Sequence, residues 1–153
     1  MASSRGNRRT VWFAVLVLGW AVYAVSLAAP AAKGDDPFGE DVHRGLEAAG
    51  DALFGFGVEA PSYPWYGIVS SLSNGLMLWS LLTILRVRPS MAFGVIVLGA
   101  AIFNLGWLLE PPRESGVELL VGYHLWIGAL VLTGVAQLIG GWRLDQTTGC
   151  TTY

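Results

Sequence analysis

The chain has 153 residues, of which 54% are hydrophobic and only 13% are charged, and its mean hydropathy is +0.54. A soluble domain of this length carries far fewer apolar residues, so the composition indicates a membrane protein. The net charge is −2, and the single cysteine, Cys150, excludes an intramolecular disulfide, a thiolate metal cluster and redox chemistry by a cysteine pair.

The first apolar run covers residues 10–30 and follows a basic start that contains Arg5, Arg8 and Arg9. At 1.5 Å per residue, about 20 uncharged residues span a hydrocarbon core of roughly 30 Å. A basic start before an apolar run is also the pattern of a cleaved signal peptide, but this run exceeds the roughly 7–15 apolar residues usual there, which favours a membrane span. Small side chains recur every seven residues and predict a packing face: Ala14, Ala21 and Ala28.

The longest polar segment, residues 33–62, is strongly acidic, with seven Asp and Glu residues against Lys33 and Arg44. Asp36 and Pro37 form a helix-start signal, because an N-cap residue is followed by proline at the first helical position. Helices that bind anionic lipid are usually basic, so we expect a helix here to pack on protein. An apolar stripe with helical spacing completes the predicted amphipathic helix: Phe38, Val42, Leu46, Ala49 and Leu53.

Residues 63–86 form the only long apolar run with a dense stripe of small and polar side chains. The opposite face carries Leu, Ile, Met and Trp, which suits lipid. The run therefore predicts a transmembrane helix whose polar face other helices approach closely. At about 100° per residue, the stripe falls within an arc of about 140° and consists of Gly67, Ser70, Ser71, Asn74 and Gly75.

A tight turn at residues 86–89 leads into a third uncharged run, residues 91–109. Two opposite faces of this run carry small or polar residues, so we expect a helix that contacts neighbours on both sides. One face has Ala92, Gly99 and Gly106, and the other has Ala100, Ala101 and Asn104.

The fourth predicted span covers residues 117–142 and follows a polar loop whose prolines, Pro111 and Pro112, stop the preceding helix. The polar tail, residues 143–153, is too short to fold by itself. The span has a small-residue face made of Gly122, Ala129, Thr133, Ala136 and Gly140.

The distribution of charge predicts how the spans are oriented. If the N-terminus, the turn at residues 86–88 and the tail are cytoplasmic, six of the nine basic residues lie there and ten of the eleven acidic residues lie on the other side. This asymmetry follows the positive-inside rule. We therefore expect one all-α domain, residues 1–153, in the cell membrane: a four-helix transmembrane bundle with both termini cytoplasmic and an amphipathic helix in the first outer loop.

Five side chains in the predicted spans are candidates for a polar site in the outer leaflet. The simpler interpretation is that these side chains form hydrogen bonds between helices, each of which stabilises the bundle by about 0.6 kcal/mol. His124, which we expect about two turns into the fourth span, is an ionisable residue in a membrane and therefore a candidate for function. The five residues are Ser70, Ser71, Asn74, Asn104 and His124.

No motif for a metal, nucleotide or catalytic nucleophile occurs, and no basic patch for nucleic acid is present. We therefore expect no enzyme, cofactor or metal; the two histidines, His43 and His124, are too few for two haems. The leading hypothesis is a structural or accessory membrane protein that binds helices of a membrane-protein partner or of a second copy within the lipid bilayer. The alternative is a small channel, carrier or cofactor-binding membrane protein that uses the outer polar site. The helix-packing positions are Gly67, Ser71, Gly75, Gly99 and Gly106.

Overall fold

The computed structural model describes residues 4–36, 39–47, 50, 64–86, 88–109 and 118–148. The described part of the chain is mostly helical, as the uncharged apolar runs predicted. Its four long helices and three short strands are α1 (Ser4–Ala28), β1 (Pro30–Asp36), β2 (Gly39–Arg44), α3 (Pro64–Arg86), α4 (Met91–Leu109), β3 (Glu118–Leu119) and α5 (Val121–Thr148).

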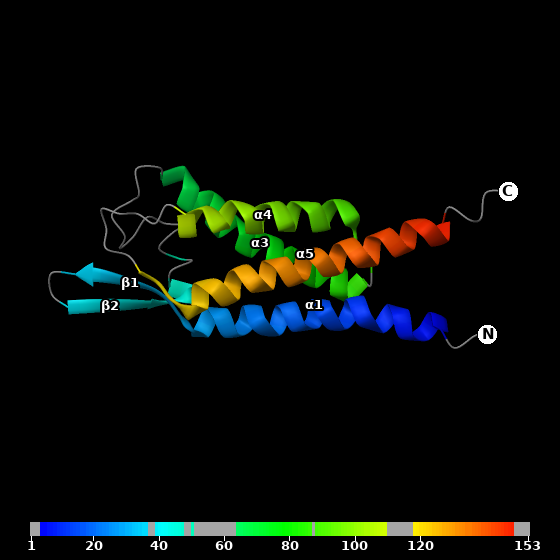
Figure 1. Ribbon diagram of the computed structural model, residues 1–153, viewed down its shortest axis with the longest axis horizontal. Helices are drawn as coiled ribbons and strands as arrows, with labels where there is room; N and C mark the ends of the chain where they lie inside the picture. The colour runs from blue at the N-terminus through cyan, green and yellow to red at the C-terminus, as the bar shows by residue number, and fades with distance from the viewer. Residues whose placement is uncertain are drawn as a thin grey trace.

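The four helices run along the long axis of the molecule (Figure 1). Helix α5 makes the most extensive contacts, with α1 on one side and α4 on the other, whereas α3 approaches its neighbours at fewer places. Helix α1 begins and α5 ends at the same end of the molecule, and the β1–β2 hairpin projects from the opposite end (Figure 1).

Three helices are long and apolar enough to cross a membrane. Their apolar stretches are Val11–Ala28 in α1, Ile68–Arg86 in α3 and Val121–Trp142 in α5. In α4 the described apolar stretch, Met91–Gly106, is shorter. The uncharged runs of the sequence thus correspond to the helices. The bounds of α3 and α4 agree with the predicted spans, residues 63–86 and 91–109, to within one residue.

Two hydrophobic clusters form the core between the helices. The larger joins all four, through residues such as Tyr23, Met77, Val97 and Leu130. The smaller lies nearer the start of α1 and contains Trp12, Leu16 and Ala136. Helix α1 is therefore part of the core, since its Leu16 side chain is fully buried.

Helices α4 and α5 approach closely at Gly94 of α4 and Gly134 of α5. A Cβ atom on Gly94 would lie 2.9 Å from the Gly134 carbonyl oxygen, so a larger residue would clash with the α5 backbone. The small face predicted for the fourth span is buried: Gly122, Ala129, Thr133, Ala136 and Gly140. The alanines of α1 at 14, 21 and 28, and Ala92 and Gly99 of α4, are exposed, whereas Gly106 on the same α4 face is half-buried. The packing predicted at the five exposed positions is therefore not made by the helices that the structure describes.

A three-stranded sheet replaces the predicted amphipathic helix over part of its length. Strand β2 pairs with β1 in antiparallel register, with Asp35 opposite Glu40, and β3 pairs with the other edge of β1. The helix prediction is wrong for residues 39–44, while residues 45–47 are helical and residues 38, 48–49 and 51–53 lie outside the described residues. The apolar stripe suggested a helix with one buried face, but the two stripe residues whose burial the structure describes are exposed: Val42 is 46% and Leu46 is 67% exposed.

The last helix is displaced toward the C-terminus relative to the prediction. It begins at Val121 because Glu118 and Leu119 pair with β1 as β3. It ends at Thr148, so the tail that we expected to remain unfolded is helical as far as that residue. No proline interrupts the sequence after residue 121, and each residue added to an existing helix gains one backbone hydrogen bond.

Candidate functional site

Helix α3 is attached to the other helices by hydrogen bonds of its polar side chains. The first group centres on Asn104 of α4, which is fully buried. The Ser70 hydroxyl of α3 donates to Asn104 Oδ1, and Asn104 Nδ2 donates to the Ala100 carbonyl at 2.7 Å and to Ser73 Oγ at 3.5 Å. The Tyr123 hydroxyl of α5 donates to the backbone carbonyl of Asn104. Both ends of this buried amide are therefore satisfied within the chain.

The second group centres on Asn74 of α3, which is half-buried. Its Oδ1 atom accepts from the Tyr23 hydroxyl of α1 at 3.1 Å and from the Trp126 indole N–H of α5 at 2.9 Å. An indole nitrogen only donates, so the atom that faces Trp126 must be the amide oxygen. Among the described residues, Asn74 Nδ2 has no acceptor. The amide is thus fixed in orientation, with its two N–H groups unused.

The third group lies toward the other end of α3. The Trp20 indole N–H of α1 donates to Ser80 Oγ at 2.9 Å, and this hydroxyl donates to the Met77 carbonyl at 2.7 Å. One turn further on, Gln137 of α5 donates to Thr83 Oγ1. Because α1, α4 and α5 each bond to α3, these contacts fix its rotation as well as its position.

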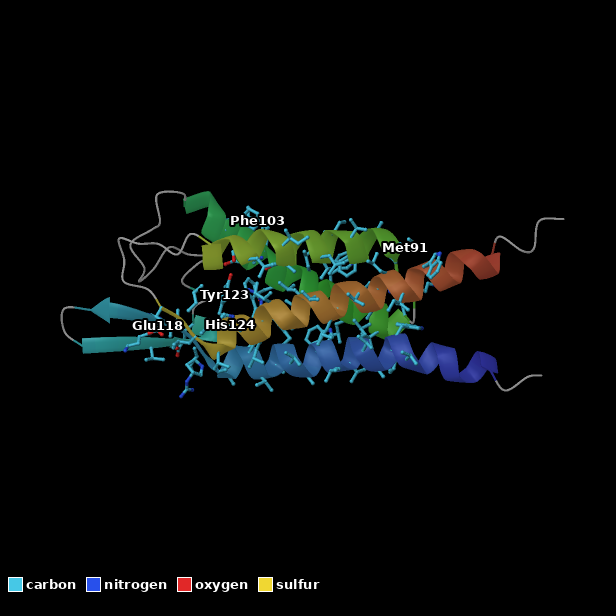
Figure 2. All side chains as sticks on the ribbon, viewed as in Figure 1. Met91, Phe103, Glu118, Tyr123 and His124 are labelled. Carbon is cyan, nitrogen blue, oxygen red and sulfur yellow. The ribbon has the colours of Figure 1, made fainter. Side chains whose placement is uncertain are left out.

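The structure brings together only some of the residues predicted for the polar site. Ser70 and Asn104 bond to each other, and Ser71 is half-buried and also has a partner. His124 is exposed in the first turn of α5, beside Tyr123 with ring centroids 5.9 Å apart, near the sheet (Figure 2). It lies nearer the start of its helix than predicted, because α5 begins four residues later than the predicted span. His124 does not join the Ser70–Asn104 pair.

Two of the predicted packing glycines, Gly75 and Gly99, are open within the described part of the chain. A Cβ atom added at Gly75 or at Gly99 would meet no heavy atom within 4 Å. Gly67 and Gly106 belong to the backbones of α3 and α4. Helix packing at these positions thus stays a prediction about another molecule, because the close contacts inside the chain use other glycines.

Sequence reasoning missed the donors that hold α3 in place. Tyr23, Trp20 and Trp126 lie in apolar runs, where an aromatic residue predicts core or interface. The available signal was their depth, because a buried tyrosine or tryptophan inside a membrane span needs an acceptor for its O–H or N–H group. Among the acceptors on α3, Asn74 was a predicted candidate, but Ser80 and Thr83 were not, and the aromatic donors were missed as well.

These groups are amides, hydroxyls and indoles, which hold helices together by hydrogen bonds. Among the described residues, no three His, Cys, Asp or Glu side chains are grouped so as to hold a metal ion. Comparisons of the chain with protein-family models, with curated proteins and with solved structures found no match. The geometry of the contacts is therefore the basis for the function proposed below.

Proposed function

We propose that the chain is a multi-pass protein of the cell membrane whose four helices all cross the bilayer. Helix α4 has 19 residues, which at 1.5 Å each is about 28 Å and close to the hydrocarbon thickness. Charge supports cytoplasmic termini, because the α3–α4 turn, whose sequence contains Arg86 and Arg88, lies toward the end where α1 begins, and the acidic hairpin projects from the other end (Figure 1). The termini and the α3–α4 turn then share the cytoplasmic side.

Within this topology, the proposed function is that of a structural or accessory subunit that binds other helices and performs no chemistry. One observation carries the proposal: α3 bonds to its own chain on one side and leaves the surface around Gly75 open on the other. Gly75 has no neighbour within 4 Å of a Cβ position, and Leu78 and Leu82 beside it are 60% and 37% exposed. A helix with a glycine at its surface lets another helix approach closely, and packing drives association in lipid.

The polar residues support this function more than the alternative of a channel, carrier or cofactor-binding protein. That alternative requires Ser70, Ser71, Asn104 and His124 to face one space. Ser70 and Asn104 instead satisfy each other in a buried contact, and His124 is exposed at the start of α5.

The experiment is photo-crosslinking in native membranes. A photoreactive amino acid replaces Leu78 on the open face of α3, and in a matched variant it replaces Val131, which is 39% exposed on α5. We expect a discrete protein adduct from position 78 and lipid adducts from position 131, both identified by mass spectrometry. Lipid adducts alone from position 78 would contradict the proposed function.

A further inference from the structure

The unused N–H groups of Asn74 require an acceptor from outside the described chain. Its Oδ1 atom already accepts two hydrogen bonds, from Tyr23 and Trp126, so its nitrogen cannot turn toward those donors. In hydrocarbon an unsatisfied donor is costly, because no water replaces the missing acceptor. An amide held in this orientation can therefore donate a hydrogen bond to an acceptor on another molecule.

The depth of Asn74 limits what that acceptor can be, on the basis of the proposed topology. Asn74 is ten residues after Pro64 and twelve before Arg86, which places it roughly 15–18 Å from either end of α3. In a hydrocarbon core of about 30 Å, this is the middle of the bilayer, beyond the reach of water and of lipid headgroups. The acceptor must itself be a polar group inside the membrane.

We propose that a second copy of this chain supplies the acceptor, through a symmetric contact of α3 with α3. In such a contact, Asn74 Nδ2 of each copy donates to the Ser71 hydroxyl of the other. A hydroxyl oxygen accepts hydrogen bonds in addition to the one that it donates. A direct pair of Asn74 amides is disfavoured, because both oxygens are already occupied.

The open face of α3 fits this occupant because it is self-complementary, as a two-fold interface requires. At the border of the face lie a donor, Asn74, and, one turn before it, the half-buried hydroxyl of Ser71, which also has a partner; Gly75 lies next to both, with open space around its Cβ position. The exposed Leu78 and Leu82 continue the face at helical spacing, three and seven residues after Gly75. Two parallel copies in one membrane then form the two hydrogen bonds reciprocally.

Cysteine crosslinking in native membranes tests the contact. Cys150 is replaced by Ser, and Leu78→Cys is compared with Leu72→Cys on the same helix; the two leucines are 60% and 59% exposed and point about 120° apart. Oxidation should give a covalent dimer of this chain from Leu78→Cys and at least roughly tenfold less from Leu72→Cys. Equal crosslinking of both variants, or none from Leu78→Cys, would overturn the proposal.

Three substitutions distinguish a loss of the α3–α3 contact from a loss of the monomer's fold. Gly75→Leu has room within the chain, so it should lower the dimer fraction by about tenfold while the thermal unfolding of the monomer is unchanged. Ser71→Ala should lower it roughly threefold through the lost acceptor. Gly128→Leu, at another glycine with no neighbour within 4 Å, is the matched control and should leave the dimer intact. A Gly75→Leu protein that dimerises as well as the parent contradicts the α3 contact.

The outcomes also distinguish this inference from the proposed function. A crosslinked product from Leu78→Cys that contains a different protein overturns self-association and leaves helix binding as the function. Labelling of Gly75→Cys by a water-soluble maleimide in sealed vesicles overturns both, because α3 would then not lie in the bilayer.

Discussion

The backbone N–H of Ser90, in the link before α4, donates to the Gln137 side-chain oxygen of α5 at 3.1 Å. The nitrogen of the same amide donates to Thr83 near the end of α3. The Ser90 hydroxyl in turn accepts from the Phe93 N–H and caps the start of α4. One fully buried glutamine thus joins the end of α3, the start of α4 and the middle of α5.

Replacing Gln137 by Leu should lower the free energy of unfolding by about 1–3 kcal/mol. The change keeps the side-chain volume roughly constant and removes two hydrogen bonds, each worth about 0.6 and at most 1.7 kcal/mol in membrane proteins. Thermal unfolding in detergent measures the effect. Val135→Leu, at a position that is 37% exposed on the same helix, should change stability by less than about 0.5 kcal/mol. Equal stability of the two variants would show that the hydrogen bonds of Gln137 do not stabilise the folded protein.

Thr133→Val should leave stability unchanged or raise it by about 1 kcal/mol. The Thr133 hydroxyl is fully buried and has no hydrogen-bond partner among the described residues, and valine has nearly the same shape. The same thermal assay applies. A clear loss of stability would mean that this hydroxyl has a partner in the folded protein.

Gly94→Ala and Gly99→Ala should have opposite effects, although both residues lie in α4. At Gly94 the added methyl group would lie 2.8 Å from the Leu138 backbone nitrogen, and we expect a loss of about 1–3 kcal/mol from overpacking. At Gly99 it meets nothing within 4 Å, so the higher helix propensity of alanine should stabilise the monomer by up to about 1 kcal/mol. The two unfolding curves, measured side by side, check the α4–α5 contact; identical shifts would contradict it.

The full-length chain should keep its first helix. Leu16 is fully buried and Tyr23 bonds to Asn74, so removal of α1 would expose part of the core and leave the Asn74 oxygen with one donor fewer. The intact mass of the purified protein is the measurement. A protein lighter by about 3 kDa would instead identify residues up to about 28 as a cleaved signal peptide.

The helices were predictable because each depends on a local property of the chain. An uncharged run of about 20 residues has few alternatives to a membrane helix, and the proline at residue 89 marks the α3–α4 turn. The sheet was not predictable, because β3 pairs with β1 across more than eighty residues and two residues give no periodic signal. Residues 39–44 matched a helical stripe by spacing alone, and the pairing with β1 decided their structure.

The sequence identified part of the polar side chains that bond between helices, but not their aromatic partners. Ser70, Asn74 and Asn104 stand out because amides and hydroxyls are rare in apolar runs, and all three bond between helices. Which helix supplies each donor depends on how the helices pack, and a single sequence does not encode that pairing locally. The depth of His124 was misjudged for the same reason, since the start of α5 is set by the β3 pairing.

The number of membrane crossings is the claim on which the proposed function and the α3 contact both depend. Fusion of a reporter that is active only in the cytoplasm measures it directly, at positions after Glu47, Arg88, Arg113 and Tyr153. Four crossings with cytoplasmic termini predict activity after Arg88 and after Tyr153 and none after Glu47 or Arg113. Activity after Glu47 or Arg113, or silence after Arg88, would contradict the four crossings.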